Sequence, residues 1–75
     1  MTMAFVMINT LPDQTEPVLE KVKGIKFVKE AHMLDGDYNL VAVIKTETEA
    51  DFHRTLGHIR KVKGISSIIF LETMK

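Results

Sequence analysis

The sequence contains no cysteine and no long apolar run. The absence of cysteine excludes a disulfide scaffold, an iron–sulfur cluster, a zinc ribbon and a thiol nucleophile. No apolar run reaches the roughly 18 residues that a membrane-spanning helix needs. The start of the chain, Met1 to Ile8, lacks the basic segment of a signal peptide. We therefore expect a soluble, cytoplasmic protein without a membrane partner.

The chain also has no excess of charge of either sign, because ten Lys and Arg residues balance ten Asp and Glu residues. Nucleic-acid binders usually carry a basic surplus, so this balance argues against a stand-alone nucleic-acid-binding protein. It also offers no net repulsion against self-association. With 75 residues, 45% of them hydrophobic, the chain is expected to form one globular domain, residues 1–75, with a small core.

A short internal repeat indicates how the chain is organised. Val22-Lys23-Gly24-Ile25 recurs as Val62-Lys63-Gly64-Ile65, 40 residues later. Each copy follows a stretch of helical periodicity and precedes a stretch rich in β-branched residues. Two strand–helix–strand units account for this placement.

The signals at the ends of the helices refine this organisation. Asp13 with Glu16 reads as a capping box for the first helix, and Gly24 is placed to end it in a left-handed conformation. Thr48, with Asp51 three residues later, predicts the start of the second helix, and Gly64 is expected to close it. The strands are expected at residues 3–9, 26–34, 38–45 and 65–73. The predicted fold is α+β and ferredoxin-like, βαββαβ, with a four-stranded antiparallel sheet and two helices on one face.

The strands predict self-association. Both faces are apolar in the first strand, where Phe5 and Met7 alternate with Val6 and Ile8, and in the third strand, residues 40–44. Strands of this kind are buried on both sides. Two short helices cover only one face of such a sheet, so we expect a dimer that packs sheet against sheet. The second strand carries Lys26, Lys29 and Glu30 and is expected at a sheet edge.

The side chains that could carry chemistry are few. His53 and His58 are five residues apart and so do not share a helix face, while His32 lies in another element. Surface histidines are therefore the favoured reading, and a two-His site completed by a carboxylate is the alternative. The acidic pairs are explained by a turn, for Asp35 and Asp37, and by a helix start, for Glu47 and Glu49. We expect no catalytic residue, no metal site and no cofactor.

Two further features are open to different readings. The basic residues Lys21, Lys23, Lys26 and Lys29 are diluted by acidic neighbours and read as a solvated face. Gly57 lies inside the second helix, where glycine costs about 1 kcal/mol relative to alanine. Either another group packs closely against Gly57, or the cost is tolerated.

The hairpin corner Gly36-Asp37-Tyr38-Asn39 is the strongest candidate for a ligand site. Gly36 can hold a positive φ and expose backbone N–H groups, which suit a carboxylate. The side-chain oxygens of Asp37 and Asn39 suit an ammonium group, and Tyr38 adds an aromatic wall. An ordinary hairpin corner explains the same residues, and both readings remain open at this point.

The pattern resembles the effector-binding domain, or RAM module, of the Lrp/AsnC (feast/famine) transcriptional regulators. The resemblance covers nearly the whole chain and is carried by Val28-Lys29-Glu30-Ala31-His32, Gly36-Asp37-Tyr38-Asn39-Leu40 and Val62-Lys63-Gly64-Ile65. It implies dimeric α+β barrel-type association and rings of dimers. It also implies that a free amino acid binds between dimers, with Gly36, Asp37, Tyr38 and Asn39 as contacts.

This chain departs from the family pattern in three ways. Family members usually carry Asp where Asn39 stands. Only two residues precede the first strand, so no helix-turn-helix domain is expected and no direct specific DNA binding. The family tends to place threonines where Ile68 and Phe70 stand, and these two residues would make the site more apolar and favour an aliphatic amino acid.

The resemblance therefore implies an amino-acid-sensing module that modulates a full-length Lrp/AsnC regulator by co-assembly. The alternative is a small dimeric α+β barrel enzyme of the monooxygenase or isomerase type. For the enzyme, we would expect His53 or His58 to point into a closed cavity within one chain. An ACT-type regulatory module fits less well, because Leu11-Pro12-Asp13 contains no glycine.

Overall fold

A computed structural model describes residues 2–74 of the chain and the side chains of residues 3–71. The elements follow one another in the predicted βαββαβ order. They are β1 (Thr2–Thr10), α1 (Thr15–Lys23), β2 (Val28–Met33), β3 (Leu40–Thr46), α2 (Glu49–Arg60) and β4 (Ile65–Met74). This order confirms the predicted ferredoxin-like fold.

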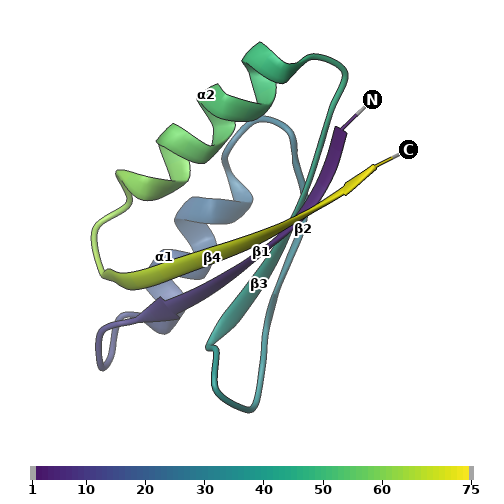
Figure 1. The fold of residues 1–75 in the computed structure, drawn as a ribbon. Coiled ribbons are helices and arrows are strands. Elements are labelled where there is room, and N and C mark those ends of the chain that lie inside the picture. Colours follow the sequence, from purple (N-terminus) through teal and green to yellow (C-terminus); the bar gives the residue numbers. More distant parts are fainter. Residues whose placement is uncertain (1, 75) are drawn as a thin grey trace.

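The four strands form one antiparallel sheet in the order β2-β3-β1-β4. The strand β2 lies at an edge, as predicted, and β4 forms the other edge. Both helices lie on the same side of the sheet and leave its other face uncovered (Figure 1). The molecule is therefore a two-layer structure with one bare sheet face.

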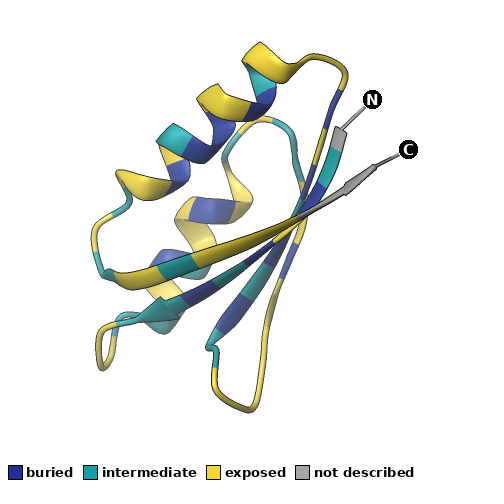
Figure 2. Cartoon of the chain, viewed as in Figure 1, coloured by how far each residue is buried: buried dark blue, intermediate teal, exposed yellow. Residues whose placement is uncertain are grey.

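The core lies between the sheet and the two helices (Figure 2). Every second residue of β1 and β3 points into it, because successive side chains of a strand alternate between faces. The fully or nearly fully buried apolar residues are Ala4, Val6, Ile8, Val18, Val22, Ala31, Leu40, Ala42, Ile44, Phe52, Leu56 and Ile59. This set contains the inward-facing residues that the alternation in the sequence predicts.

The bare face of the sheet is apolar as well. Phe5 pairs with Val43 of β3 and with Leu71 of β4, and Met7 pairs with Val41 and Ile69. Residues paired across antiparallel strands share a face, so these side chains form one patch. We call this patch, formed by Phe5, Met7, Val41, Val43, Ile69 and Leu71, the open sheet face. Leu71 is 59% exposed and Ile69 is 47% exposed.

The start of the second helix agrees with the prediction, whereas the start of the first does not. The Thr48 hydroxyl accepts a hydrogen bond of 3.0 Å from the backbone N–H of Asp51, so Thr48 caps α2 as predicted. The predicted capping box at Asp13 is wrong. The helix α1 begins two residues later, at Thr15, and its N-cap Gln14 makes no side-chain hydrogen bond. Asp13 has a φ of 66° within a turn closed by Gln14 N–H and the Leu11 carbonyl.

The predicted roles of the two glycines at the helix ends are also wrong. Gly24 does cap α1, but with a right-handed φ of −83°. The helix α2 already ends at Arg60, and Gly64 lies beyond it in the turn before β4, with a φ of 100°. In the turn after α1, the left-handed residue is Phe27, with a φ of 74°.

The two central connections also shift the predicted strand limits. The turn after α1 includes a hydrogen bond from Val28 N–H to the Ile25 carbonyl, so β2 begins at Val28 rather than at residue 26. The hairpin loop extends to Asn39, so β3 begins at Leu40 rather than at residue 38. In the part of the chain that the structure describes, no helix has the length and apolar character needed to cross a bilayer.

Candidate functional site at the hairpin corner

The loop between β2 and β3 is held by Asn39. The backbone N–H of Leu34 donates to the Asn39 carbonyl at 2.8 Å and closes the hairpin. The backbone N–H of Asn39 donates to the Ile8 carbonyl at 3.0 Å and to the Asn9 Oδ1 at 3.1 Å. These bonds attach the corner to the end of β1.

The side chain of Asn39 continues this network toward α1. Its Oδ1 accepts hydrogen bonds from the backbone N–H of Thr10, at 2.8 Å, and from the Thr10 hydroxyl, at 3.2 Å. The Thr10 and Thr15 hydroxyl oxygens are 2.7 Å apart. A hydroxyl has one proton, so Thr15 donates to Thr10 when Thr10 donates to Asn39. Asn39 thus links the corner, the end of β1 and the first residue of α1.

The predicted ligand residues of the corner lie together and differ in what they offer. Gly36 has a φ of 150°, which side-chain-bearing residues rarely adopt, and open space where a Cβ would lie. Gly36 and Asp37 are exposed, and Tyr38 and Asn39 are half-buried. Because the side-chain oxygen of Asn39 is engaged by Thr10, Asn39 acts within the chain as a positioning residue. Gly36 and Asp37 are thus the most exposed of the four corner residues.

The other two predicted ligand residues, Ile68 and Phe70, lie elsewhere in the protomer. They pair with Ile8 and Val6 of β1 and so share the helix-covered face of the sheet. Ile68 packs against the core, and the Phe70 ring meets Phe52 of α2 edge-on, with centroids 6.1 Å apart. The strand β1 separates them from β3 and its hairpin. One protomer therefore places both side chains on the helix-covered face, with one strand between them and β3.

Sequence reasoning missed the part that Asn9, Thr10 and Thr15 play at this corner. Thr10 is 29 residues from Asn39 and Asn9 is 30. No local pattern signals such contacts, because they depend on which strands become neighbours. A threonine at the end of a strand, such as Thr10, or at the start of a helix, such as Thr15, is common. Its position in the sequence does not show which residue it will hydrogen-bond.

One open surface depression lies away from the corner. It is at the opposite end of the sheet, between the start of β2, the end of β3 and the start of α2. It is lined by Phe27, Val28, Lys29, Lys45, Thr46, Glu47, Thr48 and Asp51. None of the predicted ligand residues lines it. Gly36 and Asp37 are exposed, and a Cβ at Gly36 would meet nothing within 4 Å, so these two residues lie at an open surface of the protomer.

The three histidines are exposed, and two of them lie beside a glutamate. His32 lies 2.9 Å from Glu30 on β2, and His53 lies 3.4 Å from Glu49 on α2, and all four side chains are more than half exposed. His58 is exposed on α2. Within the described residues, no three His, Asp or Glu side chains are placed to hold one metal ion. No histidine points into a closed cavity as the enzyme alternative requires.

The fold and the corner together define a structural class. The protomer is a small α+β unit, βαββαβ, with an apolar open sheet face and an exposed glycine corner, an architecture that proteins of many functions share. The family comparison narrows this class. Residues 3–75 match the family model described as the Lrp/AsnC ligand binding domain. The chain belongs to this family, which confirms the resemblance inferred from its hairpin and strand motifs.

The relatives are transcriptional regulators. The HTH-type transcriptional regulator LrpA of Pyrococcus abyssi is 31% identical over 72 residues, which cover 91% of this chain and 51% of LrpA. The chain thus spans about half the length of the curated relatives that it matches. The family and these relatives are regulators rather than enzymes.

Solved structures show the same fold. The crystal structure of FFRP-DM1 matches with a TM-score of 0.91 and 28% sequence identity, and the match covers 99% of this chain and 100% of that one. Escherichia coli AsnC matches with a TM-score of 0.85 and 20% identity, over 99% of this chain and 51% of AsnC. The second similarity is a similarity of fold alone.

Proposed function

We propose that this chain is an amino-acid-sensing module that binds a small, aliphatic amino acid between dimers and modulates a full-length Lrp/AsnC regulator by co-assembly. A cytoplasmic location goes with this proposal. The observation that carries it is the incomplete site. The polar groups of Gly36 and Asp37 are exposed at one end of a protomer that does not enclose them. A site that can surround a ligand therefore needs a second molecule.

The open sheet face supports a dimer as the unit of this assembly. Its patch includes Phe5, which is 38% exposed, together with Ile69 and Leu71. Apolar area removed from water contributes about 25 cal/mol per Å², so a second sheet packed on this patch stabilises both protomers. This is the sheet-to-sheet association expected for a dimeric α+β barrel.

The chemistry of the corner suits the main-chain end of a free amino acid. Backbone N–H groups near Gly36 can donate to a carboxylate, and the carboxylate of Asp37 can accept from an ammonium group. The apolar side chains of Ile68 and Phe70 lie on the helix side of an edge strand. When a neighbouring dimer brings these side chains to the corner of another protomer, the side-chain end of the ligand meets an apolar wall.

Binding and assembly are then linked. A ligand that contacts two dimers at once binds the assembled form and not the separated dimers. It shifts the equilibrium toward assembly by an amount set by that difference in affinity. The same linkage operates when one of the partners is the corresponding domain of a full-length regulator.

Light scattering and calorimetry with each of the twenty amino acids test this proposal. We expect one or a few aliphatic amino acids to bind and to increase the mass in solution. Asp37→Asn should weaken binding about tenfold, the loss of a charge-assisted hydrogen bond of about 1.5 kcal/mol. Asp35→Asn is the matched control, because it removes the same charge from the same loop and should leave binding unchanged.

The absence of binding by any amino acid, both for the chain alone and for the chain mixed with a full-length regulator, would show that the sensing function is wrong. Binding without any change in mass would contradict a site between dimers. Failure to co-purify with a full-length regulator from the same genome would contradict co-assembly.

A further inference from the structure

The neutral net charge of the chain conceals a strong separation of charge along it. Eight of the ten Lys and Arg residues lie in two segments, 21–29 and 54–63, and neither segment contains an Asp or a Glu. Exposed carboxylates lie in the loop after β1 and in the β2–β3 hairpin, at Asp13, Asp35 and Asp37. Others lie on α1, on β2 and around the start of α2, at Glu16, Glu20, Glu30, Glu47 and Glu49. The local charge therefore differs between surfaces even though the total is zero.

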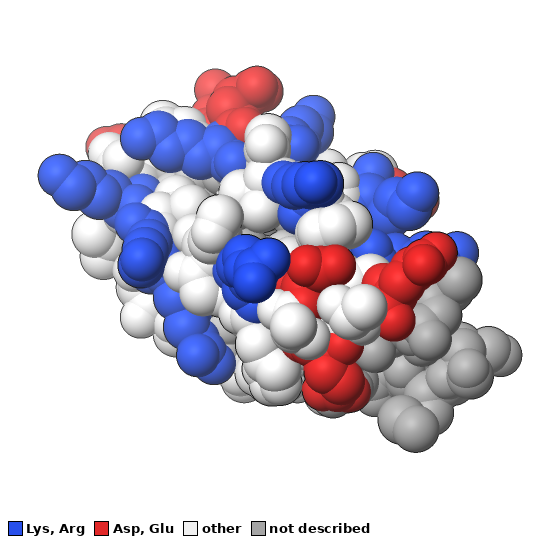
Figure 3. Space-filling view, turned by 90° about the horizontal axis from the view of Figure 1, so that it is seen from above, with Lys and Arg blue, Asp and Glu red and all other residues white. Residues whose placement is uncertain are grey.

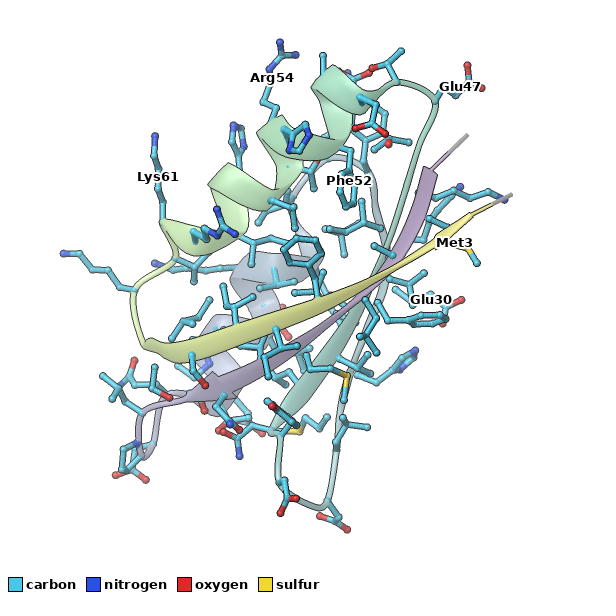
Figure 4. All side chains as sticks on the ribbon, in the orientation of Figure 1. Met3, Glu30, Glu47, Phe52, Arg54 and Lys61 are labelled. Carbon is cyan, nitrogen blue, oxygen red and sulfur yellow. The ribbon has the colours of Figure 1, made fainter. Side chains whose placement is uncertain are left out.

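The second basic segment forms the outer side of α2. Phe52, Thr55, Leu56 and Ile59 are the buried residues of this helix. His53, Arg54, Gly57 and His58 lie between them on the outward side, and Lys61, which caps the helix, continues this side just past its end. Figure 4 shows Arg54 and Lys61 extending from α2 away from the sheet, whereas Phe52 points toward it. We call these five outward residues the outer face of α2.

A lysine from outside the helix joins this face. Lys26 follows α1 in the chain, yet it lines the same shallow depression as Arg54 and His58. Asp51 lies beside this group, and its Oδ1 is 3.4 Å from the Arg54 Nη1. That pair is a surface ion pair of small energy, with the Arg54 side chain 68% exposed. Viewed from above, Lys and Arg side chains are spread over much of this side of the molecule, and Asp and Glu side chains gather beside them (Figure 3).

Gly57 lies at the centre of this face and is not required by any contact within the protomer. A Cβ built at Gly57 would meet nothing within 4 Å. Glycine inside a helix costs about 1 kcal/mol relative to alanine, and nothing in the described structure offsets that cost. Because Gly57 has no side chain, the surface between Arg54, His58 and Lys61 is shallow there, so that an incoming group can reach the helix backbone.

We infer that the outer face of α2, together with Lys26, binds the phosphate backbone of nucleic acid without reading its sequence. Arg54 and Lys61, about two helix turns apart, and Lys26 beside Arg54 form a group of cations that is complementary to a row of phosphates. The composition of the face favours this occupant over an acidic protein. The large exposed apolar side chains are Phe5, Leu11, Met33, Leu34, Ile69, Phe70 and Leu71, and none of them lies on α2. Protein interfaces take most of their energy from such anchors.

The inference goes beyond the proposed function, because it gives the ligand-binding module a contact with nucleic acid of its own. It is also independent of that function, since the corner residues at Gly36 and Asp37 take no part in it. The contact is sequence-independent, so it is compatible with the expectation that the chain does not bind DNA specifically.

Fluorescence anisotropy with a short labelled duplex of mixed sequence tests the inference. With about three phosphate contacts, we expect affinity to fall about 40-fold between about 50 and about 200 mM salt. The decisive pair of variants is Gly57→Glu and Gly57→Gln, which have the same size and differ in charge. A Cβ at position 57 meets nothing within 4 Å, and both residues form helices better than glycine. We expect Gly57→Glu to bind at least about tenfold more weakly than Gly57→Gln.

A second pair of variants controls for total charge. The double variant Arg54→Gln/Lys61→Gln should lose binding, whereas Lys23→Gln/Lys29→Gln should keep it. Lys23 and Lys29 line a separate depression along β2, so the control removes the same charge from another surface. Equal affinities for the two double variants, or for the two Gly57 variants, would overturn the inference. So would binding to polyglutamate but not to the duplex, which would identify an acidic protein as the occupant.

Discussion

At the scale of single residues, the two halves of the chain correspond through the conformation of their turns and not through their repeated sequence motif. The Val-Lys-Gly-Ile motif repeats at an offset of 40 residues. The turns after the helices, however, correspond at an offset of 37. Gly24 N–H donates to the Lys21 carbonyl in the first turn, and Lys61 N–H donates to the His58 carbonyl in the second. The left-handed residues at equivalent positions are Phe27 and Gly64.

The glycines of the repeated motif therefore have different importance for stability. Gly64→Ala should lower the free energy of unfolding by about 2 kcal/mol or more, from left-handed strain and overpacking together. The added Cβ would lie 2.9 Å from Val18 Cγ2 and 3.0 Å from Gln14 Cβ, at a φ of 100°. Gly24→Ala is the control and should cost less than about 0.5 kcal/mol, because Gly24 is right-handed and its nearest contact is at 3.6 Å.

Denaturant unfolding of both variants measures this difference. Equal losses of stability would mean that the two motif copies are structurally equivalent after all. A stable Gly64→Ala variant would mean that the turn before β4 can move away from α1.

At the scale of elements, the hairpin corner depends on one side chain that joins three of them. The Asn39 Oδ1 accepts from both the N–H and the hydroxyl of Thr10. Asn39→Ala should lower the free energy of unfolding by about 1–3 kcal/mol, because the Thr10 N–H loses its acceptor in a half-buried position. Asn39→Asp should retain most of this stability, because a carboxylate oxygen can accept the same two bonds.

Thermal unfolding and amide hydrogen exchange of the two variants separate a structural role from a ligand-binding one. We expect faster exchange at Thr10 in Asn39→Ala and near-native exchange in Asn39→Asp. Unchanged exchange at Thr10 in both variants would contradict the positioning role of Asn39.

The elements themselves follow from local patterns more reliably than their ends do. The order βαββαβ, the alternation in β1 and β3 and the Thr48 cap of α2 are all predictable, because each depends on neighbours a few residues away. The start of α1 is not. Asp13 has the composition of a cap, but the turn from Leu11 to Gln14 uses it in a left-handed conformation. Whether Asp13 or Gln14 occupies the N-cap position depends on the path by which the chain enters the helix.

At the scale of the whole molecule, the open sheet face is the feature that one protomer leaves unexplained. The proposed dimer buries it. Leu71→Glu places a carboxylate within this face, so the dimer should weaken at least about 30-fold, equivalent to about 2 kcal/mol for a poorly compensated polar group. Leu11→Glu is the matched control, since Leu11 is 50% exposed but lies in the loop after β1.

Mass measurements by light scattering over a dilution series test this prediction. We expect Leu71→Glu to dissociate to monomer at concentrations at which Leu11→Glu remains a dimer. Two dimers of equal stability would show that the open sheet face is not the interface, and a monomeric native chain would show that no such interface exists.

The site was predictable only in part. The glycine corner is recognisable because turn chemistry is local, and Gly36 does hold a positive φ. The separation of Ile68 and Phe70 from that corner, and the tie between Asn39 and Thr10, depend on strand order. Strand order is decided by long-range pairing, which no short motif encodes.

By itself, the sequence determined the fold class, the two-faced strands and the family, because periodicity and turn chemistry are properties of short segments. Only the tertiary structure decided that Asn39 holds the corner instead of facing it freely. Only the tertiary structure, too, brought Lys26 beside Arg54 and left Gly57 uncovered between cations. Both outcomes depend on which distant segments pack together. The sequence gives the chain a net charge of zero, but only the tertiary structure shows which surface is apolar and which carries the Lys and Arg side chains.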